Sequence, residues 1–154
     1  MKICCSLAAL LAVGAAAQGQ GIQYVSLEPP ATVSARRGTE VEAPLRFFIR
    51  GGYHINSNQP AEDYLIPTAL TWTAAPVAPK GVSYPKAESV KYEFSEKPLL
   101  VWSGGIVVTS KFAVAADAPL GPGNLTGKLR YQACNDRACF PPKTLEVSVP
   151  VTIR

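Results

Sequence analysis

Histidine and methionine are nearly absent from this sequence, which contains one residue of each. A structural zinc site takes four Cys or His ligands, whereas only three such residues follow residue 17. A blue-copper site takes two histidines, a cysteine and usually a methionine. Because His54 is the single histidine, no serine–histidine–acid set can be argued either. We therefore expect no metal centre and no bound cofactor.

Long apolar runs and clusters of basic residues are also missing beyond residue 17. The formal charge of +4 is spread along the chain, and no run of Lys or Arg alternates with aromatic residues. Nucleic acid is therefore not an expected partner. No apolar run there approaches the roughly 20 residues of a membrane span, and no Gly-rich phosphate loop occurs. We expect a soluble mature protein.

The first residues, MKICCSLAALLAVGAAAQGQ, have the anatomy of a secretory signal. Lys2 supplies a positive start, an apolar stretch too short to span a bilayer follows, and small alanines precede Gln18. We predict that residues 1–17 are a cleaved signal peptide and that residues 18–154 form a single domain. Cys4 and Cys5 would leave with the leader. Export of a chain with two remaining cysteines favours one disulfide.

Short runs rich in β-branched and aromatic residues make up most of the chain after the leader. They are IQYVSL, VEAPLRFFIR, TALTWTAAP, LLVW, GIVVTSKFAVA, GKLRYQA and LEVSVPVTIR. In the last run every second residue from Leu145 to Ile153 is apolar, which is the period of a half-buried strand. Turn residues separate the runs, as in RRGT, RGGY, PKG and PLGPGN. This spacing predicts an all-β fold, an immunoglobulin-like antiparallel β-sandwich.

Two polar stretches, residues 56–67 and 86–98, are predicted to be long loops between strands. Trp72 and Trp102 lie in apolar runs and are predicted to belong to the core, because large aromatics dominate protein cores.

The stretch YQACNDRACFPPK holds Cys134 and Cys139 with four residues between them. Asn135 and Asp136 favour a turn, so the cysteines would face each other on neighbouring strands, about 4.5–5.5 Å apart at Cα. A disulfide fits that distance. The loop is short, so the bond would contribute only about 2 kcal/mol to stability. Composition and spacing leave open whether it is a structural clamp or a redox-active pair.

The residues around the cysteines give two alternatives each. Arg137 is either a stabiliser of a Cys thiolate or an ordinary solvated turn residue. Phe140 is either a shield or docking residue beside Cys139 or part of the core. His54 is either a residue near the sulfurs that tunes the thiolate or shuttles a proton, or a strand-edge residue that holds a loop by hydrogen bonds. Glu62 and Asp63 are either proton acceptors near the pair or solvated loop residues.

Two segments in this order resemble the N-terminal periplasmic domain of the thiol:disulfide interchange protein DsbD. YQACNDRACFPP, residues 131–142, resembles its cysteine motif, with the Pro-Pro pair after the second cysteine. FFIRGGYHINSNQPAEDYLIPTALTW, residues 47–72, resembles its strand–loop–strand segment, including the step Gly52-Tyr53. The final KTLEVSVPV is similar to its last strand.

The resemblance implies an immunoglobulin-like domain in the periplasm whose cysteine pair cycles between disulfide and dithiol. It implies that Cys139 forms the mixed disulfide with partners and that Cys134 resolves it, as in a thiol:disulfide oxidoreductase without a cofactor. Tyr53, Tyr92 and Phe94 join the expected surroundings; of these, Tyr92 or Phe94 would be the shielding aromatic of a cap loop.

The resemblance also implies the partners. They would be thioredoxin-like proteins, including those of cytochrome c maturation, and periplasmic disulfide isomerases, with electrons supplied by a separately encoded membrane donor. The alternative function is a non-catalytic, secreted immunoglobulin-like binding module, in which the same disulfide is only a local clamp.

Overall fold

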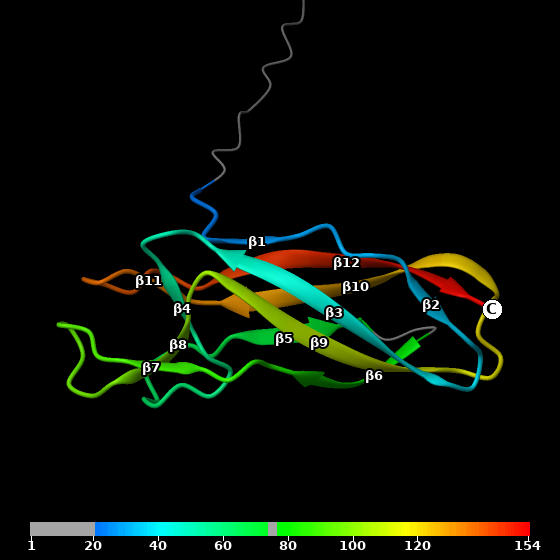
Figure 1. Cartoon of the computed structure of the whole chain (residues 1–154), viewed down its shortest axis with the longest axis horizontal. Coiled ribbons are helices and arrows are strands. Elements are labelled where there is room, and N and C mark those ends of the chain that lie inside the picture. The colour runs from blue at the N-terminus through cyan, green and yellow to red at the C-terminus, as the bar shows by residue number, and fades with distance from the viewer. Residues whose placement is uncertain (1–20, 74–76) are drawn as a thin grey trace, which may run out of the picture.

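The computed structural model describes residues 21–73 and 77–154, and these residues form twelve β-strands and no helix (Figure 1). The predicted signal peptide, residues 1–17, lies outside the described residues. The strands are β1 (Val25–Leu27), β2 (Val33–Ala35), β3 (Glu40–Ile49), β4 (His54–Asn56), β5 (Ala69–Trp72), β6 (Val77–Ser83), β7 (Glu88–Val90), β8 (Leu99–Trp102), β9 (Gly105–Val114), β10 (Gly121–Tyr131), β11 (Ala133–Cys134) and β12 (Lys143–Ile153). Within the described ranges the chain forms no helix of the length and apolarity that a membrane crossing requires.

The strands pair into three four-stranded sheets, in the orders β1-β3-β9-β6, β2-β12-β10-β5 and β11-β4-β8-β7. The first two sheets pack face to face. Phe47 of β3 and Leu129 of β10 are fully buried in one core cluster, and the rings of Trp72 and Phe112 meet edge to face at 5.0 Å. The predicted all-β, immunoglobulin-like sandwich is confirmed. Its strand pairs are antiparallel except for β2 and β12, which pair in parallel.

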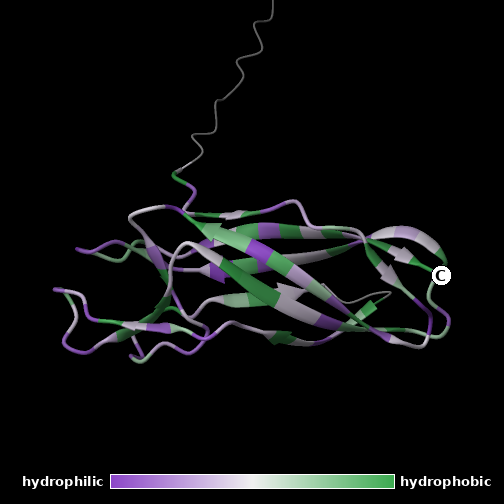
Figure 2. Cartoon of the chain, in the orientation of Figure 1, coloured by the Kyte–Doolittle hydropathy of each residue, from purple (hydrophilic) through white to green (hydrophobic). Residues whose placement is uncertain are grey.

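Alternation along the long strands builds the core. Figure 2 shows hydrophobic and hydrophilic residues alternating along β3 and β12. In β12 the alternation matches burial as predicted: Val147, Val149, Val151 and Ile153 are buried. Burying an aliphatic side chain of this size contributes about 1.5–3 kcal/mol, so each strand has one stable register.

The two tryptophans differ in depth. Trp102 is buried in the core, with its indole Nε1 donating to the Pro85 carbonyl at 3.2 Å. Trp72 is half-buried against the core and donates to Ser110 Oγ at 2.9 Å. Each buried indole N–H therefore has an acceptor, as burial requires.

The third sheet continues the sandwich strands at the end opposite the C-terminus (Figure 1). The strand β3 turns into β4 through Gly52 (φ 82°), and β8 turns into β9 through Gly104 (φ 63°). A side chain at such a positive φ would be strained, so glycine permits both bends. After a single residue, Gln132, β10 is followed by β11. The chain thus passes between the third sheet and both sandwich sheets: β3 and β9 belong to the first sheet and β10 to the second, and β4, β8 and β11 lie together in the third.

Several sequence-based boundaries were wrong. The PKG stretch was expected to be a turn but lies inside β6, where the pairing with β9 shifts register between Pro79 and Gly81. The expected loop over residues 86–98 contains β7, and the short strands β2 and β4 were not predicted. The expected turn PLGPGN already includes the start of β10 at Gly121. Short strands are defined by their partners, which local composition does not reveal.

Candidate functional site

The two cysteines form a disulfide at the tip of the third sheet. Cys134 ends β11 and pairs with Cys139 as an antiparallel bridge, with the Cα atoms 3.9 Å apart. This distance is shorter than the expected 4.5–5.5 Å, because the two residues face each other at the neck of a four-residue turn instead of along two full strands. The turn is closed by hydrogen bonds from Asn135 N to Ala138 O and from Phe140 N to Ala133 O, both 2.9 Å.

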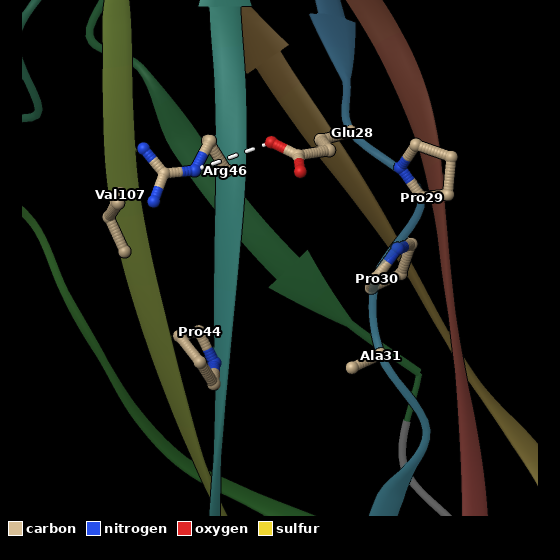
Figure 3. Close-up of a pocket in the computed structure, with 7 residues that line it drawn as sticks. All are labelled: Glu28, Pro29, Pro30, Ala31, Pro44, Arg46 and Val107. Carbon is tan, nitrogen blue, oxygen red and sulfur yellow. Dashed lines mark ion pairs between the residues drawn. The ribbon is translucent and has the colours of Figure 1, made fainter.

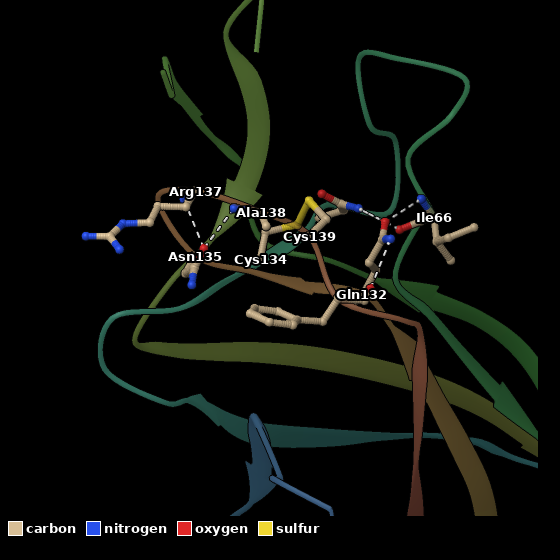
Figure 4. Close-up of a disulfide and its surroundings, with 9 residues drawn as sticks. Ile66, Gln132, Cys134, Asn135, Arg137, Ala138 and Cys139 are labelled. Atoms are coloured by element: carbon tan, nitrogen blue, oxygen red, sulfur yellow. Dashed lines mark hydrogen bonds between the residues drawn. A yellow bond between two sulfur atoms is a disulfide. The ribbon is translucent and has the colours of Figure 1, made fainter. Parts of the chain in front are cut away.

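Asn135 shapes the turn between the cysteines. Its side-chain oxygen accepts hydrogen bonds from the backbone N–H of Arg137 at 2.9 Å and of Ala138 at 2.8 Å (Figure 4). This arrangement is an Asx turn, and it explains why a short polar residue follows Cys134. These bonds do not involve sulfur, so the disulfide is not the only interaction that holds the turn.

The two sulfur-bearing residues differ in burial. Cys134 is fully buried, with 0% of its surface exposed, whereas Cys139 is partly exposed. An external thiolate must approach the sulfur that it attacks, so access favours Cys139 over Cys134.

The loop between β7 and β8, residues 91–98, is the candidate cap loop and lies beside the cysteine sheet. Tyr92 of this loop and Cys139 both pack against the small apolar cluster of Leu65, Leu99 and Val101. The Tyr92 ring stacks at 4.1 Å on the imidazole of His54. Burial, together with the charge of Glu88, raises the pKa of the Tyr92 phenol. Tyr92 and Cys139 thus pack against the same apolar cluster.

Phe94 lies one step further out on the cap loop. Its ring stacks on Tyr92 at 5.5 Å and is 37% exposed. Hydrogen bonds within the cap loop stabilise its turn. Ser95 N donates to Tyr92 O at 3.2 Å, and the Lys91 ammonium donates to Ser95 O. Phe94, Tyr92 and His54 therefore form one aromatic row that leads from the surface to the cysteine sheet.

A second aromatic cluster lies on the other face of the same sheet. Phe140 stacks on Tyr24 at 5.3 Å, and Tyr53 meets Phe140 at 5.9 Å and Tyr24 at 4.8 Å. Tyr53 and His54 are consecutive, as are Phe140 and Cys139, and side chains alternate between faces. Phe140 and Tyr53 pack against the main core. Phe140 thus packs against the core, which is the second of its two predicted alternatives. It does not belong to the cluster that Tyr92 and Cys139 pack against.

His54 occupies the centre of the site. It is 3% exposed and is the register partner of Cys134 across β4 and β11. Because β4 lies between β11 and β8, His54 is not at a sheet edge, and its Nε2 atom has no hydrogen-bond partner among the described residues. The alternative in which it holds a loop by hydrogen bonds is therefore not observed at this atom. Burial lowers the pKa of the imidazole to about 4.

The charged candidates are peripheral. The side chain of Arg137 is exposed and points away from the disulfide (Figure 4). Glu62 forms an ion pair with Lys97 of the cap loop, 3.3 Å between Oε1 and Nζ, and so links that loop to the segment before β5. Asp63 is exposed.

Sequence reasoning did not single out Gln132, although it lies within the cysteine motif. Its side-chain oxygen accepts hydrogen bonds from Asn56 Nδ2 at 3.0 Å and Ile66 N at 3.1 Å, and its Nε2 donates to Phe140 O at 3.2 Å (Figure 4). One amide thus ties the cysteine turn to β4 and to the loop before β5. A glutamine between two strands is the only local signal of this role, and it is weak.

A surface pocket lies beside β3, where Glu28 and Arg46 form an ion pair at 3.3 Å between proline side chains (Figure 3). It shares no residue with the cysteine site. Within residues 21–73 and 77–154, no group of three or more His, Cys, Asp or Glu side chains could hold a metal ion.

Solved structures of other proteins are similar to this chain in fold. The crystal structure of the N-terminal periplasmic domain of ScsB from Proteus mirabilis superposes with a TM-score of 0.52 at 12% identity, over 83% of this chain and 44% of that chain. The seventh ScaB type I cohesin from Pseudobacteroides cellulosolvens gives 0.48 at 14% identity, over 85% and 92% of the two chains. At 12% identity the ScsB domain shows the fold alone.

Comparison of the sequence with protein families identifies the family of this chain, which the solved structures do not. No curated protein is similar to this chain at a significant level. Residues 23–150 match the family described as "Thiol:disulfide interchange protein DsbD, N-terminal", which covers most of the chain and both cysteines. The chain therefore belongs to the family of N-terminal domains of the thiol:disulfide interchange protein DsbD.

Proposed function

We propose that this protein relays two electrons between protein partners by thiol–disulfide exchange at Cys139. The observation that carries the proposal is the unequal burial of the pair: Cys134 is enclosed and Cys139 is partly exposed. A structural clamp needs no such asymmetry, whereas an exchange site needs one accessible sulfur and one protected sulfur close by.

The reaction has two exchanges in each direction. In the dithiol form, the Cys139 thiolate attacks a partner disulfide; a mixed disulfide forms and one partner sulfur leaves as a thiolate. Cys134 then attacks Cys139 Sγ, the Cys134–Cys139 bond forms, and the partner's second sulfur leaves. The partner has gained two electrons and the domain has lost two. A donor dithiol restores the dithiol form by the reverse sequence.

Opening the disulfide does not require unfolding. Asn135, Gln132 and Phe140 N hold the turn through hydrogen bonds that do not use sulfur. The closed loop is short, so its loss removes only about 2 kcal/mol of stabilisation. The main core reaches the cysteine turn at Ala133 and Phe140 but extends over both large sheets, so most of its packing does not depend on the disulfide.

The cap loop fits a gating role. Tyr92 packs with Cys139 against one apolar cluster, while Phe94 is at the surface. We propose that this loop shields the dithiol from small oxidants and moves aside when a partner docks. Partners of the thioredoxin-like class and periplasmic disulfide isomerases, including those of cytochrome c maturation, suit an exchange site of this kind. The family and the predicted leader support a periplasmic location, and a membrane-bound electron donor is proposed.

The test is the reduction potential of the pair in glutathione or dithiothreitol buffers. Exchange proteins lie at roughly −270 to −120 mV and structural disulfides below about −300 mV. We expect a value in the upper range with the fold unchanged on reduction. A value in the lower range would support the binding-module alternative instead.

Single-cysteine variants provide a matched pair of controls. Cys134→Ser should accumulate a mixed disulfide with a thioredoxin-like protein that lacks its own resolving cysteine, because Cys139 is accessible. Cys139→Ser should not, because Cys134 is buried. The double serine variant should unfold cooperatively and lose all exchange. Loss of the folded state in that variant would contradict the proposal.

A further inference from the structure

His54 is a buried polar residue whose hydrogen bonding is incomplete in the disulfide form. Only 3% of its surface is exposed, and Nε2 has no partner among the described residues. Buried polar groups are almost always paired, and each exception calls for an explanation. The stacking of the ring on Tyr92 fixes the plane of the imidazole without satisfying its nitrogen.

The residue directly opposite His54 is Cys134. The pairing of β4 with β11 places the two in register, and directly opposed residues project to the same face with Cβ atoms about 4.5–5.5 Å apart. The neighbouring pair, Ile55 and Ala133, belongs to the main core on the other face. His54 and Cys134 therefore share the capped face.

The imidazole is neutral at neutral pH, since burial holds its pKa at about 4. Burial is the sole cause of this shift, so no charged side chain of the described elements packed around His54 contributes to it. The titratable groups nearest to it are the Tyr92 phenol and, in the dithiol form, the two cysteine thiols. A neutral imidazole has one donor and one acceptor nitrogen, and a thiol can serve either.

We propose that His54 is a positioning residue that pairs with the Cys134 thiol when the disulfide is reduced, and so stabilises the dithiol form of the carrier. The inference rests on the proposed exchange function. It names His54 as one residue that sets the reduction potential of the Cys134–Cys139 pair. Reduction adds two electrons and two protons to the pair. In the dithiol form, the S–H bond on Cys134 faces His54, and the sulfur is no longer held by Cys139. The disulfide form has no such proton, so the stabilisation belongs to one redox state.

The test compares His54→Phe with His54→Gln in the mature protein purified from the periplasm of an expression host. Phenylalanine keeps a ring on Tyr92 without nitrogen, and glutamine keeps hydrogen-bonding groups without the ring. We expect the equilibrium constant for reduction by glutathione to fall about tenfold in His54→Phe, which is about 30 mV for two electrons, and to fall less in His54→Gln. An unchanged constant in His54→Phe would overturn the inference.

A measurement on the unmodified protein covers variants that fail to fold. His54 is the single histidine, so its imidazole ¹⁵N resonances are assigned without ambiguity. We expect the Nε2 shift to change on reduction as this atom gains a partner. An Nε2 shift that is the same in both redox states would overturn the inference while leaving electron relay intact. A wild-type disulfide that no dithiol reduces without unfolding would instead refute the proposed function itself.

Discussion

Replacing Gln132 with leucine should destabilise the protein by about 2–4 kcal/mol. Leucine is similar in size and cannot form the three side-chain hydrogen bonds that Gln132 makes with Asn56, Ile66 and Phe140. Each bond contributes about 0.5–1.5 kcal/mol, and a buried partner left unpaired costs about 1–3 kcal/mol. Asn56 is fully buried, with 0% of its surface exposed, and its side-chain amide would keep only its bond to Ile66 O at 3.0 Å. Its second amide hydrogen would lose its acceptor.

Urea unfolding of the oxidised protein measures this loss, with fluorescence of the two tryptophans as the signal. Gln132→Glu keeps an acceptor for Asn56 Nδ2 and Ile66 N, but its second oxygen would face the Phe140 carbonyl oxygen, so this variant should also be destabilised. Thr71→Val is the control, because the Thr71 hydroxyl donates to Lys128 O at 3.4 Å in an exposed setting. It should cost less than about 0.5 kcal/mol. If Gln132→Leu lost no more than that control, the assigned role of Gln132 would be wrong.

Three further predictions concern access, pH and packing. In the reduced protein, iodoacetamide should modify Cys139 at least about tenfold faster than Cys134, as followed by mass spectrometry, and equal rates would contradict the proposed roles. Burial lowers the pKa of His54 from 6.5 to about 4, so the unfolded state binds its proton first as the solution is acidified. The free energy of unfolding should therefore decrease by about 3 kcal/mol as the pH is lowered from about 6.5 to 4. His54→Phe should remove this part of the pH dependence. Gly127→Ala should destabilise the fold by about 1–3 kcal/mol in urea unfolding, because the new Cβ would lie 2.6 Å from the Thr71 carbonyl oxygen; an unchanged midpoint would mean that β5 moves freely.

The long strands could be predicted from the sequence because their periodicity is local. Alternation in β12 and the apolar runs of β3, β8 and β9 were sufficient to predict an all-β sandwich. The pairing of Cys134 with Cys139 could also be expected, since two turn-forming residues follow the first cysteine. The PKG stretch and β7 were misassigned, because each becomes a strand only by pairing with a longer neighbour.

The sequence by itself determined the cysteine pair, the strand pattern and the likeness to the DsbD N-terminal family. Only the tertiary structure decided which sulfur is enclosed, that His54 lies opposite Cys134, and that Gln132 joins the cysteine turn to β4. Tyr24 likewise reaches Phe140 only because β1 pairs with β3. Strand register between segments far apart in the chain sets these contacts, and register depends on the packing of whole sheets. A local pattern can therefore predict which residues form strands, but the side chains that surround the sulfurs are chosen by the fold.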